Sequence, residues 1–522
     1  MIFADQLRNA ARFAGDNEAV RLGDEALSFS DIYERSCRLT QLFAHAALVP
    51  GDKVSSLGRN RLESVEETTG VALGGFVRSP LYMHNSTSSH VYMIQRVGAK
   101  ALIVDAEMWS ALHDALAEAG VTLELVLVRG ADQAGVPTGG HIMDYDRALQ
   151  NVEANDPGVE VDDRSIHIIR FSAGTTGQPK PIALTWRNWH AMGNELLILA
   201  PPIGRNDTEL VISPYSHGSG NLLWPMISAQ ARQLILPKFE AENALELIEK
   251  YRCSILFLVP TMIQLLVDHP DAARRDLSSL KTVFYGAAPL SEETLRKALA
   301  IWGPCMYQMY GQSEAAPVTM LRPEDHSLDG INRLSSVGRA TPNSSVRIES
   351  PEGEILPPNT PGQVVITGPG QMAGIYGDEK ATKARLTSDG WIRTGDIGQL
   401  DEDGYLQLTD RMEDIIISGG FNVWPAEIEK SLYAHPKIRE VVAFAVPHPT
   451  WGETPAVVAR VDNVDEVTED ELIKWCRDRL GSVKKPSYVV LTVEELPKSS
   501  AGKLLRRKIQ SDYLFQKSSD RR

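Results

Sequence analysis

A stretch rich in glycine and threonine is the part of the sequence whose residue types most clearly suit chemistry. It follows an apolar strand predicted over residues 165–171 and reads Ser172-Ala173-Gly174-Thr175-Thr176-Gly177-Gln178-Pro179-Lys180. Glycine lets backbone N–H groups approach an anion, threonine hydroxyls add donors, and Lys180 brings a positive charge. We predict a polyphosphate-binding loop. Its spacing differs from the common nucleotide-binding loop, since two residues separate the last glycine from the lysine; a solvated surface turn is the alternative.

Other stretches suit a nucleotide and a metal ion. The stretch Tyr310-Gly311-Gln312-Ser313-Glu314 offers an aromatic face, a hydroxyl and a carboxylate that could hold a magnesium ion bridging phosphates. Asp396 follows a glycine, a good geometry for accepting hydrogen bonds from two ribose hydroxyls. Gly286-Ala287-Ala288 could admit a flat ring against its backbone. Alone, each also fits an ordinary turn, or a helix N-terminus in the case of residues 310–314.

Three more stretches complete the set. His217 lies in a turn of small residues, where it could line a pocket; a structural histidine fits equally well. The run from Asp410 to Glu429 joins a charged connector to a strand, a Gly419-Gly420 turn and a helix that begins with proline. Lys503 lies on a glycine-flanked loop beside other cations, a pattern that by itself indicates a solvated basic tail.

The bulk composition limits the class of protein. A chain of 522 residues is too long for one ordinary core, so we expect at least two domains. The net charge of −15 gives no general attraction for nucleic acid or anionic membranes. The N-terminus lacks the order of a secretion signal, and the most apolar stretch, residues 254–267, is too short to span a bilayer. The four cysteines are far apart, which favours neither disulfides nor zinc. We expect a cytoplasmic protein.

The elements that must position these residues alternate between strand and helix. Hydrophobic periodicity predicts α/β patterning from residue 53 to 309, including strands at 233–236, 254–258, 282–285 and 306–309, and a helix after Ser291. Near the N-terminus we expect a hairpin over residues 19–29 and a helix capped by Ser30. Residues 346–409 show short strands and turn signals, which indicates a β-rich subdomain, and the tail from 411 shows a small α+β pattern.

Order, spacing and content of these stretches resemble the adenylate-forming superfamily of acyl-CoA synthetases, peptide-synthetase adenylation domains and luciferases. The resemblance extends over nearly the whole chain, from the Pro50-Gly51-Asp52 turn to the Lys503 loop. It implies an α/β fold whose large N-terminal domain, residues 1–410, has stacked α/β subdomains and a β-rich subdomain. A small mobile α+β C-terminal domain, residues 411–522, would follow a hinge at 411–414.

The resemblance also implies an activity and its residues. The chain would join a hydrophobic carboxylic acid to AMP, release pyrophosphate from ATP with Mg²⁺, and transfer the acyl group to coenzyme A. Catalytic roles would fall to Lys503, Glu314, His217 and Lys180, with Glu314 as the metal ligand. Cofactor-binding roles would fall to Ser172, Gly174, Thr175, Thr176 and Gly177 around the phosphates, to Gly286, Ala287, Ala288, Gln308, Met309, Tyr310, Gly311, Gln312 and Ser313 around the adenine and α-phosphate, to Asp396 and Arg411 at the ribose, and to Gly419 and Gly420 along the pantetheine tunnel.

The acyl acceptor and the acid leave alternatives open. No acidic residue follows His217, which disfavours an amino acid substrate, and no carrier-protein serine motif follows Lys503. Coenzyme A is favoured over a free-standing carrier protein. A non-catalytic binding protein or a dinucleotide-dependent oxidoreductase is a distant alternative, the latter from the loose fingerprint at residues 368–374. We expect a roomy hydrophobic pocket for a fatty, aryl or bulky polycyclic acid. Its lining would combine small and apolar residues, namely Gly218, Gly220, Ala287, Ala316, Trp224, Val259, Met262 and Met309. A homodimer is a common arrangement among similar enzymes.

Overall fold

The computed structural model describes residues 2–83, 85–172, 179–326, 333–411, 414, 416–418, 421–449, 451–498 and 504–519. Its contacts divide the chain into two compact units. Unit 1 comprises Met1–Ser345 and Ile366–Ile392, and unit 2 comprises Val346–Val365 and Arg393–Arg522. The boundary predicted at residues 410–411 stays a prediction.

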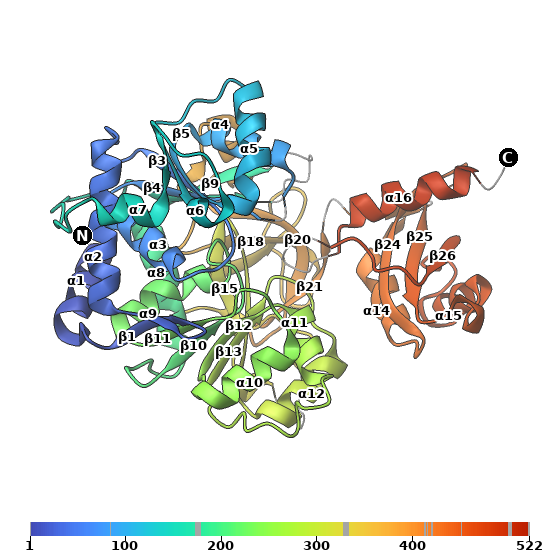
Figure 1. The fold of residues 1–522 in the computed structure, drawn as a ribbon. Coiled ribbons are helices and arrows are strands. Elements are labelled where there is room, and N and C mark those ends of the chain that lie inside the picture. Colours follow the sequence, from blue (N-terminus) through green and yellow to red (C-terminus); the bar gives the residue numbers. More distant parts are fainter. Residues whose placement is uncertain are drawn as a thin grey trace. The chain divides into compact units, whose positions relative to one another are not determined.

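The first sheet of unit 1 is mostly parallel. Among the described residues it has eight strands in the order β19-β9-β8-β4-β3-β5-β6-β7. Strand β9 runs antiparallel to β8 and to β19, and the other neighbouring pairs are parallel. Figure 1 labels β3, β4, β5 and β9 of this sheet. The strands are β3 (Lys53–Leu57), β4 (Val77–Pro80), β5 (Ala99–Asp105), β6 (Leu125–Arg129), β7 (Ile142–Asp144), β8 (Ile166–Ser172), β9 (Lys180–Thr185) and β19 (Gly374–Ile375). The parallel strands are buried on both faces, as the predicted α/β pattern requires.

The second sheet of unit 1 has nine strands in the described part of the chain, in the order β16-β15-β14-β13-β12-β10-β11-β1-β2. Strands β10 to β14 are parallel, and β14 then turns back into β15 as an antiparallel hairpin. The strands are β1 (Glu18–Leu22), β2 (Glu25–Ser28), β10 (Thr208–Val211), β11 (Arg232–Ile235), β12 (Ile255–Leu258), β13 (Thr282–Gly286), β14 (Met306–Gln312), β15 (Ala315–Leu321) and β16 (Arg339–Ala340).

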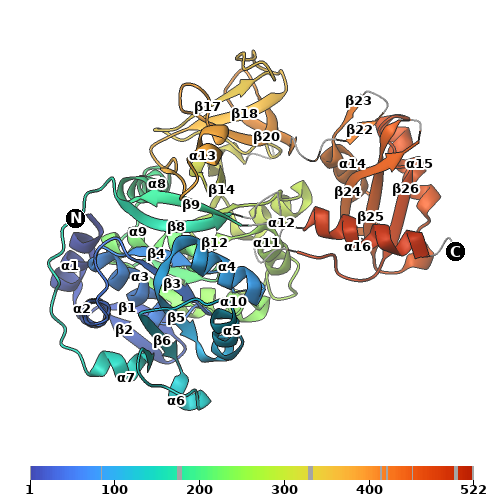
Figure 2. The same ribbon diagram turned by 90° about the horizontal axis from the view of Figure 1, so that it is seen from above.

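Helices cover both sheets of unit 1 (Figure 2). They are α1 (Ile2–Ala14), α2 (Phe29–His45), α3 (Glu63–Leu73), α4 (Thr87–Val97), α5 (Ala106–Glu118), α6 (Ala131–Ala134), α7 (Tyr145–Gln150), α8 (Trp186–Leu199), α9 (Leu223–Ala229), α10 (Ala241–Tyr251), α11 (Pro260–Val267), α12 (Glu292–Trp302) and α13 (Glu379–Arg385). Helices α4 and α5 pack on one face of the first sheet, and α2 and α7 on the other. Helices α10, α11 and α12 form a core with β10, β12 and β13. Among the described residues, no helix combines the length and hydrophobicity that crossing a membrane requires.

In the N-terminal region the predicted hairpin is confirmed, whereas the predicted cap of the following helix is wrong. Strands β1 and β2 pair as predicted, and Gly23 at their turn has φ +59°. The cap of α2 is Ser28. Its side chain accepts a hydrogen bond from the Asp31 N–H, and the Asp31 side chain accepts one from the Ser28 N–H. Ser30, the predicted cap, lies inside the helix. The reciprocal bonds favour Ser28 because Asp31 stands three residues beyond it. The predicted Ser291 cap of α12 is confirmed.

Unit 2 contains two smaller sheets. Among the described residues, β17 (Ser345–Glu349), β18 (Gly362–Thr367), β20 (Ile392–Leu400) and β21 (Leu406–Arg411) form one sheet, which confirms the β-rich character expected of residues 346–409. The other contains β22 (Ile416–Ser418), β23 (Phe421–Val423), β24 (Ile438–His448), β25 (Gly452–Val461) and β26 (Tyr488–Thr492). Helices α14 (Pro425–Tyr433) and α15 (Glu469–Leu480) pack on one face of this sheet, and α16 (Arg506–Ser519) packs on the other.

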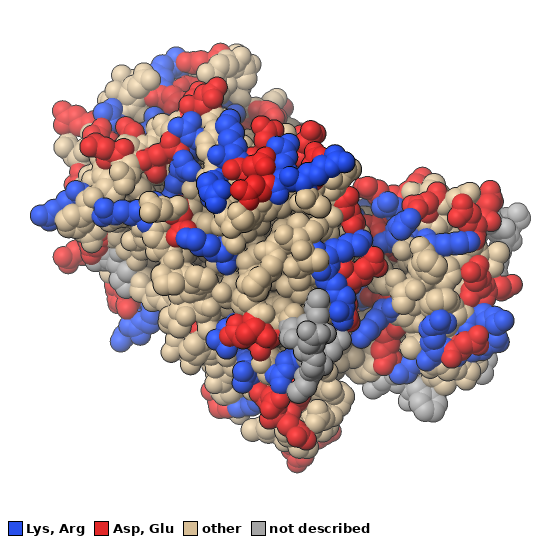
Figure 3. Space-filling model, turned by 90° about the horizontal axis from the view of Figure 1, so that it is seen from below, with Lys and Arg blue, Asp and Glu red and all other residues tan. Residues whose placement is uncertain are grey.

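Charged side chains of both signs are mixed on one face of the molecule. On the face in Figure 3, the described acidic and basic residues are interspersed around an uncharged area. A nucleic-acid-binding face would instead carry basic residues in a continuous patch or stripe.

Candidate functional site

The predicted phosphate loop connects the antiparallel strands β8 and β9. Ser172 at the end of β8 pairs with Lys180 at the start of β9, so the two ends of the loop are adjacent in the sheet. The predicted residues Gly174, Thr175, Thr176 and Gly177 lie outside the described residues. The Lys180 side chain is half-buried. An anion held by this loop would therefore meet a lysine fixed at the root of a strand.

Strands β13 and β14 and the turn after β13 carry the residues that we predict to frame the adenine. Gly286 ends β13 opposite Met309 of β14, and a Cβ on this glycine would lie 2.3 Å from the Met309 carbonyl oxygen. Only glycine therefore fits between the strands. The next residue, Ala287, has φ +68° and is exposed, which leaves its backbone open to a ligand, and Ala288 is half-buried beside it. The Gln308 side-chain carbonyl accepts a hydrogen bond from the Tyr285 hydroxyl at 3.2 Å.

Tyr310 to Glu314 form the end of β14 and its turn into β15, and not a loop or a helix N-terminus. Tyr310 is buried, whereas Gln312 and Ser313 are half-buried. A Cβ on Gly311 would approach the Ala315 carbonyl oxygen to 2.6 Å, so the hairpin requires glycine there. Glu314 is 8% exposed.

Glu314 has a cationic partner that the sequence did not reveal. Arg385 at the end of α13 donates to Gln312 Oε1 at 2.9 Å and lies 3.3 Å from Glu314 Oε1. The predicted metal ligand is thus held by a guanidinium from a helix 71 residues further along the chain. Helix α13 is polar and has no buried residue, so its sequence carries no sign of this role.

A short segment that contains β19 connects the hairpin of Glu314 to the strand of Lys180. In this segment, residues 372–376, the Met372 N–H donates to the Glu314 carbonyl at 2.6 Å and the Tyr376 N–H donates to the Pro181 carbonyl at 2.8 Å. Pro181 is the neighbour of Lys180. Five residues of backbone thus link the predicted metal ligand to the strand that begins with Lys180.

His217 lies in the segment between β10 and α9. Its Nδ1 is 2.9 Å from the Ser216 hydroxyl, and its ring centroid is 3.5 Å from that of Tyr82. Burial lowers the pKa of His217 well below its ordinary value, and the positive charges of Arg170 and Arg78 lower it further. His217 is therefore neutral at physiological pH and can exchange a hydrogen bond without adding charge.

The pocket predicted from small residues near His217 is wrong in part. A Cβ on Gly218 would lie 2.4 Å from the Phe257 ring, and one on Gly220 would lie 2.1 Å from the Tyr215 carbonyl oxygen. These two glycines allow close packing, so their small size does not itself create space for a ligand. Trp224 is packed in the core, where its ring stacks on that of Phe3 with 4.6 Å between the ring centroids.

The predicted ribose-binding residues lie in unit 2. Asp396 is buried in β20 and stands opposite Arg411 of β21. Its N–H donates to the Thr394 hydroxyl at 3.0 Å, and that hydroxyl donates to the Val364 carbonyl at 2.6 Å. The structure thus places Asp396 and Arg411 on neighbouring strands.

The remaining predicted residues fall outside the described part of the chain. Lys503 is among them, although Lys498 and Leu504 on either side pair as an isolated bridge. Gly419 and Gly420 are also among them; the flanking strands β22 and β23 pair with Ser418 opposite Phe421.

The predicted ligand, Glu314, fits magnesium better than it fits a metal ion that is held by three or more protein side chains. Among the described residues, no group of three histidine, cysteine or acidic side chains could hold an ion. Glu314 offers a single carboxylate beside a predicted phosphate loop. Magnesium binds in this way, through one or two carboxylates together with phosphate oxygens and water.

Comparisons with known proteins agree with this geometry. The family model described as AMP-binding enzyme matches residues 7–376, and that of the AMP-binding enzyme C-terminal domain matches residues 427–503. A feruloyl-CoA synthase of Amycolatopsis sp is 30% identical over 96% of this chain and 97% of its own length. The medium/long-chain-fatty-acid–CoA ligase FadD8 of Mycobacterium tuberculosis is 31% identical over 94% of this chain and 86% of its own. The amide bond synthetase McbA from Marinactinospora thermotolerans superposes with a TM-score of 0.86 and 27% identity, over 98% of this chain and 100% of its own.

Proposed function

Because the chain belongs to the family of AMP-binding enzymes, we propose that it is an ATP-dependent, AMP-forming acid–coenzyme A ligase. The observation that carries this proposal is the backbone link between Glu314 and Lys180 through residues 372–376. A metal-binding carboxylate and a phosphate-loop lysine on one rigid frame match the needs of a triphosphate substrate.

In the first half-reaction, a carboxylate oxygen of the acid attacks the α-phosphorus of ATP. The bond from that phosphorus to the oxygen bridging the β-phosphate breaks, and pyrophosphate leaves. Lys180 and the loop of Thr175, Thr176 and Gly177 would hold the β- and γ-phosphates, while Gly286, Ala287, Ala288 and Gln308 would frame the adenine. Two anions must approach each other in this step, so preorganised positive charge supplies most of the acceleration.

Glu314 would hold magnesium together with phosphate oxygens. The bound ion would supply positive charge where negative charge develops on the phosphates. Without the ion, Arg385 lies 3.3 Å from the Glu314 carboxylate and donates to Gln312, so the ion would have to share this carboxylate with the guanidinium.

Unit 2 would contribute to both half-reactions. Asp396 and Arg411 would bind the ribose, and Lys503 would bridge the acid and the α-phosphate. We propose that residues 411–522 form a mobile domain with a hinge at 411–414, and that Gly419 and Gly420 line the tunnel for the pantetheine arm once the domain has turned.

In the second half-reaction, a thiol sulfur attacks the acyl carbonyl. The bond from that carbonyl to the AMP oxygen breaks, and the thiol proton passes to solvent. Coenzyme A is the proposed acceptor, in line with the names of the two relatives above. A carrier protein is the alternative thiol. A cytoplasmic location and a homodimer remain predictions.

An amine is a second candidate acceptor. The similarity to an amide bond synthetase extends over its whole length, and an acyl adenylate reacts with an amine nitrogen as it does with a thiol. The activation half-reaction is the same for both candidates.

An acceptor assay distinguishes them. The chain is incubated with ATP, Mg²⁺ and a panel of fatty and aryl acids, together with coenzyme A, a primary amine or a phosphopantetheinylated carrier protein, and products are identified by mass spectrometry. We expect AMP and an acyl-coenzyme A thioester in equal amounts. Amide formation without thioester would replace the ligase by the amide-forming candidate, and the absence of AMP with every acid would contradict both.

A further inference from the structure

Two arginines in the interior of unit 1 lack an acidic partner. Arg78 on β4 is 7% exposed and Arg170 on the neighbouring β8 is 9% exposed. Among the described residues, no carboxylate lies within ion-pair distance of either guanidinium. Arg78 Nη2 donates to the Tyr215 carbonyl at 3.2 Å, whereas Arg170 Nε has no hydrogen-bond partner in the described part of the chain. The Arg170 guanidinium carbon lies 5.5 Å from the centre of the Trp189 ring.

Other buried cations of this unit are paired. Arg129, which is 3% exposed, lies 2.8 Å from Asp105 and donates to Glu67, and the half-buried Arg35 donates to the buried Glu66 at 2.8 Å. Their partners raise the pKa of Arg129, whereas burial lowers that of Arg170 and lowers that of Arg78 to about 10. An unpaired buried charge is strongly unfavourable, so Arg170 needs an anion from outside the described chain.

The surroundings of Arg170 place that anion at the proposed site. Arg170 precedes Ser172, where the phosphate loop begins, by two residues. It is close enough to His217 to lower the pKa of that histidine, and Tyr82, whose ring contacts His217, acts electrostatically on Arg170 in turn. The negative charge of Glu314 also acts on Arg170, but Glu314 is held by Arg385 at 3.3 Å.

We infer that Arg170 is a recognition residue for a carboxylate of the acid substrate. The inference rests on the proposed function and deepens it. The carboxylate has two sources: the group that is adenylated, or a second carboxylate at the far end of a dicarboxylic acid. Phosphate is the less suitable anion, since Lys180 and the loop that follows β8 already serve it. His217 is neutral and can hydrogen-bond the same group without competing for its charge.

Calorimetric titration with matched acids tests the inference. Hexanoate and hexanedioate, and benzoate and terephthalate, are titrated into the full chain in the presence of a non-hydrolysable ATP analogue. The variants are Arg170→Gln and, as a control, Arg187→Gln, whose exposed side chain pairs with Asp163 at 3.0 Å. Losing a charged hydrogen bond should weaken acid binding about 10- to 100-fold in Arg170→Gln and leave the control unchanged. Weakening for all acids assigns Arg170 to the reacting carboxylate, and weakening for diacids alone assigns it to the second one.

Two results would overturn the inference. If Arg170→Gln binds every acid as tightly as the parent chain does, Arg170 does not recognise a carboxylate, while the ligase proposal stands. If the parent chain binds none of the acids and forms no AMP, the inference and the ligase proposal are both wrong.

A stability measurement separates recognition from packing. Arg170→Met keeps the length of the side chain and removes its charge. If Arg170 awaits a ligand, this variant should melt at or above the temperature of the parent chain without acid, because an unpaired buried charge is lost. A clear fall in melting temperature for Arg170→Met would show a structural role and contradict the inference.

Discussion

Arg385 lies 3.3 Å from Glu314 Oε1 and donates at 2.9 Å to Gln312, two residues earlier on the same hairpin. The Arg385 guanidinium is therefore paired with the same Glu314 carboxylate that we propose as the magnesium ligand. Metal and guanidinium compete for one negative charge, and the competition has measurable consequences.

Replacing Arg385 should lower the magnesium requirement. A partly exposed pair such as this contributes about 0.4–1 kcal/mol, so Arg385→Gln should reach its half-maximal rate at about two- to fivefold less Mg²⁺. The measurement is the rate of AMP formation against Mg²⁺ concentration. Arg296→Gln is the control, since Arg296 pairs with Glu292 on an exposed helix face. A higher requirement in Arg385→Gln would mean that the arginine assists the metal and does not compete with it.

Lys503 should be needed for activation and not for thiol transfer. Losing one charge that faces the reacting phosphate should slow adenylation by about 10²–10³-fold in Lys503→Ala. A synthetic acyl adenylate supplied with coenzyme A should still give thioester at the parental rate, because the carboxylate is already activated. Lys508→Ala is the control on the neighbouring helix, where Lys508 pairs with Asp512. Equal loss in both half-reactions would contradict the proposed division of labour.

The contact between β13 and β14 should not tolerate a methyl group. A Cβ at Gly286 would lie 2.3 Å from the Met309 carbonyl oxygen, so Gly286→Ala must separate the strands that frame the adenine. We expect a destabilisation of about 1–3 kcal/mol and weaker ATP binding. Gly204→Ala is the matched control, because nothing lies within 4 Å of its Cβ position and its φ is not in the left-handed region. Thermal melting and ATP titration would show whether the two variants differ.

His167 should make the fold sensitive to mild acid. Burial, with the charge of Arg78, lowers its pKa from 6.5 to about 3, so between these values the unfolded chain binds a proton that the folded chain excludes. Stability is complete above pH 6.5 and falls as the pH drops below it. Between pH 7.5 and 5.5 the loss is about 1.4 kcal/mol from this residue.

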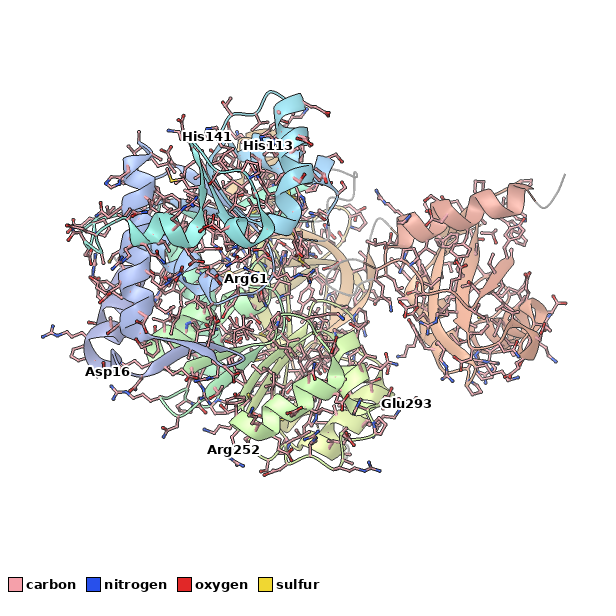
Figure 4. The ribbon with its side chains drawn as sticks, in the orientation of Figure 1. Asp16, Arg61, His113, His141, Arg252 and Glu293 are labelled. Atoms are coloured by element: carbon pink, nitrogen blue, oxygen red, sulfur yellow. The ribbon has the colours of Figure 1, made fainter. Side chains whose placement is uncertain are left out.

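The variant His167→Phe should lack that loss, since a phenyl ring can keep the contacts with Phe3 and Trp186. Urea unfolding at the two pH values measures it. His141→Gln is the control; His141 is exposed and labelled in Figure 4. If His167→Phe and the parent chain lose the same stability on acidification, His167 is not the source.

Much of the fold could be predicted from the sequence because local signals and burial agree. The strand before the phosphate loop, the hairpin turn at Gly23 and the Ser291 cap each follow from periodicity or turn chemistry within a few residues. Where two local signals competed, the prediction was wrong: Ser28 and Ser30 are both capping residues, and only the reciprocal bond with Asp31 decides between them.

Contacts between side chains from distant segments could not be predicted from the sequence. Gly218 and Gly220 were interpreted as space for an acyl chain, but small residues permit close packing as readily as they line a pocket, and Phe257 and Tyr215 fill the space. Arg385 could not be assigned because its partner is 71 residues away. Arg170 did leave a signal, a charged residue within a buried apolar strand, whose meaning depends on the absence of a carboxylate from the described surroundings.

The most direct test of the central claim is the exchange of labelled pyrophosphate into ATP without coenzyme A. If an acid displaces pyrophosphate at this site, exchange should require both an acid and Mg²⁺, persist without any thiol, and fall by about 10²–10³-fold in Lys503→Ala. Exchange that is equally fast without acid, or unaffected by the loss of Lys503, would contradict the claim that this chain activates carboxylic acids as acyl adenylates.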